Sequence, residues 1–434
     1  MKYYSLNQQS PKVSFKEATI KGQAPDKGLY FPESLPRPDK SWITGINGMS
    51  NAAIAFDVIQ PYVGNDIPED ELRRIVEETV NFPSPLVQVN DHIFALELFH
   101  GPTLAFKDTG ARFMSRCLGY FAKERSEKIT VLVATSGDTG GAVANGFYEV
   151  DGVDVVILYP SGKVSSVQEK QLTALGKNIH ALEVNGTFDD CQRMVKQAFA
   201  DETLTQKKML TSANSINVAR WLPQQFYYFF AYKQWSQKDK PPVFSVPSGN
   251  FGNICAGLLA HISGLPAAHF IAACNVNDVV PRYLHSGNYE VKKALPTLSN
   301  AMDVGDPSNF VRVLQLFDNN FINLKKMLSG YTVTDAETKD TIKRVNQDTG
   351  YLPDPHGAVG YLSLERYLKQ HHDQKGIFLE TAHPVKFYDV VELVTGEKVP
   401  VPPAIASLLQ LPKQSIQIEA VYAALKEYLE KEDD

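Results

Sequence analysis

The stretch that decides the fold is residues 129–147, which read ITVLVATSGDTGGAVANGF. Its first six residues are apolar or β-branched, which predicts a buried strand over residues 129–134. A turn rich in glycine and hydroxyl side chains follows at residues 135–141, and residues 142–147 favour the beginning of a helix. A strand that passes through a glycine-rich turn into a helix is typical of parallel α/β sheets.

The same order of elements recurs further along the chain. Residues 243–246 predict a strand, residues 247–253 a turn, and residues 254–259 the start of a helix. Further buried strands are predicted for the apolar runs at residues 153–160, 270–274 and 376–379. Because these strands are apolar throughout and alternate with helices, we expect an α/β fold of mostly parallel sheets covered by helices on both faces.

The ends of the chain have different sequence patterns. Residues 1–85 lack glycine-rich loops and carry helical patterns, of which residues 67–76 are the clearest, with a proline and three acidic residues at the start. The polar run at residues 234–242 is typical of a crossover between domains. Residues 420–430 predict an amphipathic C-terminal helix. A length of 434 residues is enough for two or three domains.

Composition excludes several classes of protein. The chain has 43 basic and 49 acidic residues, and the resulting net charge of −6 disfavours broad binding to nucleic acids or anionic membranes. No apolar stretch approaches the roughly 20 residues that cross a bilayer, and the first residues lack the apolar core of a signal peptide. The four cysteines are far apart, which favours buried, reduced thiols. We therefore expect a cytoplasmic protein, and the histidine spacing predicts no metal site.

Two glycine-rich turns are candidates for anion binding. Residues 248–253, SGNFGN, precede a helix whose first backbone N–H groups lack partners, and glycine lets an anion approach them closely. The dinucleotide and Walker fingerprints are absent. Residues 135–140, TSGDTG, add hydroxyl groups that could hold a carboxylate or phosphate. The alternatives are a tight turn with no ligand in the first case and an ordinary helix cap in the second.

The strongest chemical candidate is Lys107, within residues 100–108, HGPTLAFKD. Small and apolar residues surround it, so we expect the lysine to be partly desolvated, which disfavours the ammonium form. A neutral amine is what Schiff-base chemistry requires. The alternative is a loop lysine whose charged end reaches solvent.

Residues 99–108 resemble the cofactor-lysine motif of the threonine synthase family, which belongs to the fold-type-II pyridoxal-phosphate enzymes. Gly28–Pro32 resembles the N-terminal signature of the long, N-terminally extended members. Other segments are similar to that family in the same order, at residues 134–140, 158–165, 212–217, 246–252 and 381–384. The resemblance spans essentially the whole chain and implies the fold-type-II arrangement.

The resemblance implies roles in holding pyridoxal 5′-phosphate. Lys107 would form the Schiff base with the cofactor, and Thr381 would face its pyridine nitrogen. The cofactor phosphate would be held by the backbone amides of Gly249, Asn250, Phe251, Gly252 and Asn253. In the same motif as Thr381, we expect His383 to be a structural turn residue.

The resemblance further implies that O-phospho-L-homoserine and water are converted into L-threonine and phosphate by γ-elimination and β-addition. The loop around the amino-acid end of the substrate would contain Thr135, Ser136, Asp138 and Thr139. The substrate phosphate would be bound by Asn214, Ser215, Arg220 and Lys163. Related enzymes often have Asn at the position of Asp138, and a carboxylate there would repel an anionic group unless it were protonated or turned aside.

Other functions stay open. Another fold-type-II lyase, such as a serine/threonine dehydratase, would share the lysine and the phosphate turn but needs no substrate-phosphate site. A non-catalytic relative would lack the lysine or the turn, and both are intact. A nicotinamide-dependent dehydrogenase would carry the fingerprint that is missing here.

The resemblance also implies a division of the chain. We expect residues 1–85 to form an N-terminal helical domain, residues 86–115 and 241–400 a large cofactor domain, residues 116–240 a smaller substrate domain, and residues 401–434 a C-terminal helical segment. Closure of the smaller domain would exclude water from the reaction. Similarity to the extended members favours a monomer.

Overall fold

The computed structural model describes residues 1–135 and 137–431. The chain divides into two compact units, each built from separate stretches of sequence. Unit 1 contains Met1 and residues 31–106 and 221–400, and unit 2 contains residues 2–30, 107–220 and 401–434. The N-terminal 85 residues are thus shared between the units, and the division after residue 220 precedes the polar run at 234–242. The expected four-part division stays a prediction.

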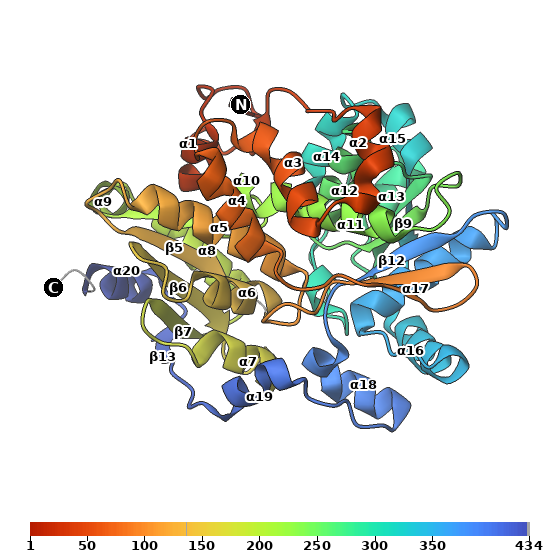
Figure 1. Ribbon diagram of the computed structural model, residues 1–434. Helices are drawn as coiled ribbons and strands as arrows, with labels where there is room; N and C mark the ends of the chain where they lie inside the picture. The colour runs from red at the N-terminus through yellow and green to blue at the C-terminus, as the bar shows by residue number, and fades with distance from the viewer. Residues whose placement is uncertain (136, 432–434) are drawn as a thin grey trace. The chain divides into compact units, whose positions relative to one another are not determined.

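Unit 1 is built around a six-stranded sheet (Figure 1). Its strands lie in the order β11 (Leu328–Thr332), β10 (His269–Cys274), β9 (Val243–Pro247), β12 (Gly376–Glu380), β4 (Ile93–Glu97) and β3 (Leu86–Gln88). Neighbouring strands are parallel except for the β3–β4 pair, which is antiparallel. The mostly parallel α/β sheet expected from the sequence is therefore confirmed, with one antiparallel strand at its edge.

Helices cover both faces of this sheet. Val243 and Phe378 pack in one apolar cluster with Tyr361 and Leu364 of helix α17 (Pro355–Leu368). The next residue of β9, Phe244, contacts Tyr228 instead, with ring centroids 5.3 Å apart. Because successive side chains of a strand point to opposite faces, α17 and the segment around Tyr228 lie on opposite sides of the sheet.

The other helices of unit 1 are mostly short. The α-helices are α2 (Lys40–Gly45), α3 (Asn51–Val63), α4 (Glu69–Thr79), α11 (Phe226–Gln234), α12 (Gly252–Ile262), α13 (Val279–Ser286), α14 (Phe310–Leu316), α15 (Phe321–Met327), α16 (Asp335–Thr349) and α18 (Tyr388–Thr395). The 3-10 helices are η1 (Ile46–Gly48), η2 (Leu222–Gln225), η3 (Asn300–Met302) and η4 (Pro384–Phe387). The predicted helix near residues 67–76 corresponds to α4, whose N-cap is Pro68.

Unit 2 contains a five-stranded sheet that is parallel throughout. Its strands lie in the order β13 (Ile416–Glu419), β7 (Ile179–Asn185), β6 (Val153–Pro160), β5 (Ile129–Ala134) and β8 (Met209–Ser212). The associated helices are α1 (Phe15–Lys21), α5 (Lys107–Ala122), α6 (Asp138–Phe147), α7 (Ser166–Thr173), α8 (Phe188–Ala200), α9 (Glu202–Lys207), α10 (Val218–Trp221), α19 (Pro403–Gln410) and α20 (Tyr422–Lys431). Strands β1 (Tyr3–Ser5) and β2 (Tyr30–Pro32) form a separate two-stranded sheet.

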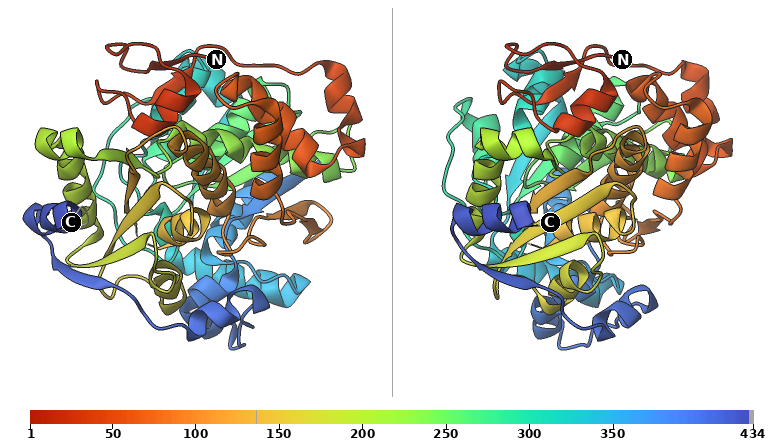
Figure 2. Two further views of the ribbon diagram at one scale, coloured as in Figure 1. Left: turned by 60° about the vertical axis from the view of Figure 1, so that its left-hand side comes forward. Right: turned by 90° about the vertical axis from the view of Figure 1, so that its left-hand side faces the viewer.

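The C-terminal residues complete the core of unit 2. Strand β13 pairs with β7, and helix α20 lies against α8 (Figure 2). Leu425 and Leu429 of α20 are fully buried in the same apolar cluster as Met194 of α8. The predicted amphipathic helix at residues 420–430 is therefore confirmed, and its apolar side is part of the core.

Two expectations from composition can be compared with the structure. Cys117, Cys191, Cys255 and Cys274 are all buried and form no disulfide, as predicted. Among residues 1–135 and 137–431, no helix combines the length and apolar character needed to cross a membrane.

A buried carboxyl group ends the central strand β12. Glu380 is fully buried, and its Oε1 accepts a hydrogen bond of 2.7 Å from the backbone N–H of Asp354. Its Oε2 has no hydrogen-bond partner among the described residues. A Cβ atom at Gly357 would overlap this carboxyl group, so the first turn of α17 leaves room for it only because residue 357 is glycine. Burial, together with the nearby charge of Asp354, raises the pKa of Glu380 well above its usual value, so the fold favours the protonated carboxyl group.

The free energy of unfolding of the Glu380→Gln variant should increase relative to that of the wild type as pH rises. Above about pH 4.5 the unfolded chain loses this proton while the folded chain keeps it, so the wild-type free energy of unfolding falls by up to about 1.4 kcal/mol per pH unit until the folded pKa is reached. Glutamine has no such proton. The variant's free energy of unfolding minus that of the wild type, measured by urea denaturation, should therefore grow between pH 5 and pH 8. The exposed Glu77→Gln is the control, and a difference for Glu380→Gln that does not change with pH would contradict this assignment.

Candidate active site

Lys107 follows a loop that is tied to the residues after strand β12. Phe106 donates its backbone N–H to the carbonyl of Thr381 at 2.9 Å, and Ala105 forms an isolated bridge with Ala382. The backbone N–H of His383 donates to Leu104, which adopts the left-handed conformation with φ of 59°. These bonds fix the backbone directly before Lys107, which is the first residue of helix α5.

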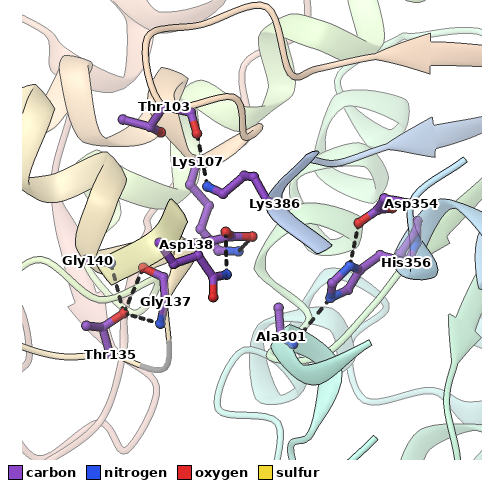
Figure 3. A network of polar contacts seen from close by, with 12 residues as sticks. Thr103, Lys107, Thr135, Gly137, Asp138, Gly140, Ala301, Asp354, His356 and Lys386 are labelled. Atoms are coloured by element: carbon purple, nitrogen blue, oxygen red, sulfur yellow. Dashed lines mark hydrogen bonds and ion pairs between the residues drawn. The ribbon is translucent and has the colours of Figure 1, made fainter. Parts of the chain in front are cut away.

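The amine of Lys107 faces a carboxylate. Its Nζ lies 3.7 Å from Oδ2 of Asp138, and the two side chains point toward one another (Figure 3). Only 16% of the lysine side chain and 4% of the aspartate side chain are exposed. The other oxygen of Asp138, Oδ1, accepts a hydrogen bond of 2.9 Å from Nε2 of Gln168. The burial of Lys107 agrees with its apolar sequence neighbours, and Asp138 lies between the amine of Lys107 and the amide of Gln168.

The turn at residues 135–141 is stabilised by its own first hydroxyl group. Oγ1 of Thr135 accepts from the backbone N–H groups of Gly137 at 3.0 Å and Gly140 at 2.9 Å. This capping contact is the alternative that the sequence left open for Thr135. Thr139 is partly buried in the first turn of α6. Ser136, the other candidate in this turn, lies outside the described residues.

The polar side chains of residues 248–253 hold the backbone of that turn in place. Ser248 donates to the carbonyl of Val246 at 2.8 Å, and Nδ2 of Asn253 donates to that of Pro247 at 2.7 Å. Oδ1 of Asn250 accepts from the backbone N–H of Ser308 at 2.6 Å. A Cβ on Gly249 would lie 2.6 Å from the carbonyl oxygen of Ala301, so η3 passes directly against this glycine.

The geometry of this turn suits a phosphate group. Phe251 has the left-handed conformation, with φ of 62°, and helix α12 begins at the next residue, Gly252. The first N–H groups of a helix have no acceptor within it and carry partial positive charge. A left-handed residue beside a helix start turns successive N–H groups toward a common point, which is the backbone arrangement that binds anions. The residues present therefore fit the cofactor phosphate expected here.

Thr381 comes directly after Glu380, at the carboxyl end of β12, and is 6% exposed. Two residues later, Nδ1 of His383 accepts from the backbone N–H of Val385 at 3.1 Å and caps η4. Burial lowers the pKa of His383 to about 4, so the ring is neutral at pH 7. These contacts match the structural role predicted for His383.

Sequence reasoning did not identify the buried pair Asp354 and His356. Nδ1 of His356 lies 2.7 Å from Oδ2 of Asp354, and Nε2 accepts from the backbone N–H of Ala301 at 3.3 Å (Figure 3). The acceptor role of Nε2 places the proton of the neutral ring on Nδ1. The pair therefore connects the start of α17 to η3, the segment that packs on Gly249. The sequence Asp-Pro-His is a signal for a capped helix start, but it does not indicate this contact.

The candidates for binding the substrate phosphate differ in exposure. Arg220 is 3% exposed, and its guanidinium donates to the carbonyl of Ala213, directly before Asn214 and Ser215. Burial lowers the pKa of Arg220 to about 10, with Asp108 acting in the opposite direction, so the side chain stays protonated at pH 7. Asn214 and Ser215 are partly buried, whereas Lys163 is exposed. The structure therefore brings Arg220 to the segment with Asn214 and Ser215, while Lys163 lies on a different loop.

The topology explains why residues far apart in sequence share one edge of each sheet. The carboxyl ends of neighbouring parallel strands meet at the same edge, where α/β proteins bind their ligands. In unit 1, β4, β12 and β9 are neighbours, and they lead into the loop before Lys107, into Thr381 and into residues 248–253. In unit 2, β6, β5 and β8 are neighbours, and they lead into Lys163, into Thr135 to Asp138 and into Asn214 with Ser215.

Comparison with known proteins gives matches along the chain. The family model described as pyridoxal-phosphate dependent enzyme matches residues 76–379. Models described as threonine synthase N terminus and threonine synthase, C-terminal, match residues 2–80 and 357–429.

Individual relatives match over nearly their full length. A threonine synthase from Haemophilus influenzae is 45% identical over 99% of this chain and 100% of its own length. The crystal structure of threonine synthase from Escherichia coli is 42% identical, with a TM-score of 0.92 and full coverage of both chains. A pyridoxal-phosphate-bound threonine synthase from Brucella melitensis is 36% identical, with a TM-score of 0.93 over 99% of both chains. The chain therefore belongs to the threonine synthase family of pyridoxal-phosphate-dependent enzymes.

Proposed function

We propose that the protein converts O-phospho-L-homoserine and water into L-threonine and phosphate, with pyridoxal 5′-phosphate bound to Lys107. The observation that carries this proposal is the mostly buried lysine amine 3.7 Å from the carboxylate of Asp138, at the start of a helix in a chain of this family. When bound, the cofactor supplies an electron sink that stabilises negative charge on the substrate Cα. The side chains and backbone of this chain bind the cofactor and the substrate and transfer protons.

Each cofactor-binding residue has a separate task in this proposal. Lys107 holds the cofactor covalently, and the backbone N–H groups of residues 249–253 bind its phosphate through the positive end of helix α12. Thr381 would hold the pyridine nitrogen through its hydroxyl. Because this hydroxyl is neutral, it does not force a proton onto the ring as a carboxylate would.

Lys107 also serves as the proton carrier. With substrate bound, the amine of Lys107 would accept a proton from the substrate Cα and return it at the end of the reaction. Asp138 stabilises the ammonium form that exists between these two transfers, because opposite charges at this distance in a buried site attract strongly. The loop from Thr135 to Thr139, including Ser136, embraces the amino-acid end of the substrate.

The substrate phosphate is bound by Arg220 with Asn214, Ser215 and Lys163. Arg220 supplies a permanent positive charge, since its pKa of about 10 keeps it protonated. Asn214 and Ser215 add neutral donors, and the exposed Lys163 adds charge from a second loop. After its release from the substrate, the phosphate stays on these residues and activates the attacking water.

The closest alternative is a serine/threonine dehydratase, which needs the same lysine and cofactor turn. A buried arginine beside Asn214 and Ser215 favours a substrate with a second anionic group, which serine and threonine lack. We further propose that the protein acts as a monomer in the cytoplasm and binds no nucleic acid.

A direct assay distinguishes these two activities. Phosphate release from O-phospho-L-homoserine should exceed ammonia release from L-serine by at least about 100-fold in kcat/KM, because a site built for a charged group strongly rejects a substrate without it. L-Threonine should accumulate in equal amount to phosphate. Ammonia release from serine at a comparable or higher kcat/KM would support the dehydratase instead.

Arg220→Ala should lower kcat as well as raise KM, with a combined loss of about 100-fold or more in kcat/KM. The reason is that the proposed phosphate site acts both in binding the substrate and in activating water. Lys163→Ala is the exposed comparison and should have the smaller effect. Arg220→Lys keeps the charge and tests whether the buried site folds without the guanidinium. An Arg220→Ala enzyme with raised KM and unchanged kcat would contradict the role in turnover.

A further inference from the structure

We propose that Gln168 is a positioning residue that holds Asp138 as a hydrogen-bond acceptor facing Lys107. The inference rests on the proposed function, in which Lys107 carries the cofactor. Gln168 lies on helix α7, and its amide reaches Asp138 at the start of α6. Its role is thus exerted through Asp138 and not through contact with reacting atoms.

The orientation of the Gln168 amide is set by the cap of its own helix. Ser165 is the N-cap of α7, and its backbone N–H donates to Oε1 of Gln168 at 3.2 Å. The backbone N–H of Gln168 donates in return to Oγ of Ser165 at 3.3 Å. Because Oε1 is used as the acceptor in this capping box, Nε2 is the atom that faces Asp138, at 2.9 Å. Turning the amide over would lose both hydrogen bonds.

The glycine turn packs directly on this amide. Gly137 has a φ of 142°, and a Cβ there would lie 2.5 Å from Cδ and Nε2 of Gln168. Gln168 is 2% exposed and Asp138 is 6% exposed. A hydrogen bond to a charged group in such a dry setting is stronger than one at the surface, and leaving its acceptor unpaired costs more.

The arrangement accounts for an aspartate at this position. Nε2 of Gln168 is a donor, so Oδ1 of Asp138 must accept, and Oδ2 faces Nζ of Lys107. Both neighbours therefore favour the ionised carboxylate. This resolves how a negative charge is accommodated where related enzymes often have Asn: Asp138 is turned toward the lysine nitrogen.

Charged groups on or beside the neighbouring elements have partners of their own. Helix α5 presents Lys107 and helix α7 presents Gln168. On α7, Glu169 pairs with Lys413 at 2.7 Å, and on β6, Tyr159 donates to Glu183 at 3.3 Å. The Asp108 charge acts on Arg220.

The substitution Gln168→Glu tests the contribution of the amide N–H donor of Gln168. The new side chain has the same shape and can still cap Ser165, since glutamate is a usual residue at this position of a capping box. It replaces the N–H donor by a second carboxyl group next to Asp138, and two carboxyl groups at this distance share a proton. At low pH the introduced carboxyl is protonated and can donate to Asp138 as the amide does. As pH rises through its raised pKa, that bond is lost and repulsion takes its place.

The test uses the full chain with added pyridoxal 5′-phosphate. We expect the ratio of the cofactor dissociation constants, variant to wild type, to stay within about threefold at pH 5.5 and to rise to about tenfold or more at pH 8.5. The ratio of kcat/KM values, variant to wild type, should fall over the same pH range. The dissociation constants are measured by equilibrium dialysis, and the kcat/KM values are measured by the threonine assay.

Two further variants keep the test decisive. Ser165→Ala removes one hydrogen bond of the capping box and leaves the Gln168–Asp138 bond intact. The ratio of its cofactor dissociation constant to that of the wild type should therefore not change with pH. Gln168→Met removes the donor without adding charge and should weaken cofactor binding at every pH. A flat ratio for Gln168→Glu, or a pH-dependent ratio for Ser165→Ala, would overturn the role of Gln168. If the wild-type chain binds no cofactor at Lys107, the proposed function fails instead.

Discussion

The proposed chemistry depends on the contact between the amine of Lys107 and the carboxylate of Asp138, which are 3.7 Å apart and mostly buried. A buried lysine alone would favour its neutral form, since desolvation disfavours the charge. The carboxylate opposes this effect and stabilises the protonated nitrogen. In the proposed reaction Lys107 reacts as an amine and also carries a proton, and these two tasks need both influences. The burial of Lys107 supplies the first, and Asp138 supplies the second.

Sheet topology gathers the other candidate residues at one edge of each sheet. Three neighbouring strands of one sheet end at the loop before Lys107, at Thr381 and at the turn of residues 248–253. Three neighbouring strands of the other sheet end at the candidate substrate residues. Buried polar contacts then fix the turns, as Asp354 and His356 do for η3 beside Gly249. The candidate residues thus lie on loops and at helix starts that follow the strands, and the strands determine where these segments begin.

Much of the fold could be predicted because buried parallel strands are apolar without interruption. Strands 129–134 and 153–160 have the predicted bounds, and β9, β10 and β12 differ by one residue at one end. Strand β13 was not predicted, since it lies at a sheet edge and half of its residues are polar. Strand β7 was missed for a related reason, because His180 and Glu183 interrupt its apolar pattern.

The polar contacts of the site could not be predicted in the same way. Gln168 follows a serine at capping distance, so sequence indicates its cap but not its bond to a side chain 30 residues earlier. Glu380 looks like the polar end of a strand, and only the fold places Asp354 and Gly357 against it. Periodicity reports which face of an element is buried, whereas these contacts depend on which elements become neighbours.

The most direct measurement is borohydride reduction of the purified protein after addition of pyridoxal 5′-phosphate, followed by peptide mapping. Reduction fixes a Schiff base to its lysine, so the mass of the reduced cofactor should appear on the peptide that contains Lys107. The wild-type protein should lose its visible absorption band at the same time. A colourless protein that takes up no pyridoxal 5′-phosphate, or a label on another lysine, would contradict the assignment of Lys107.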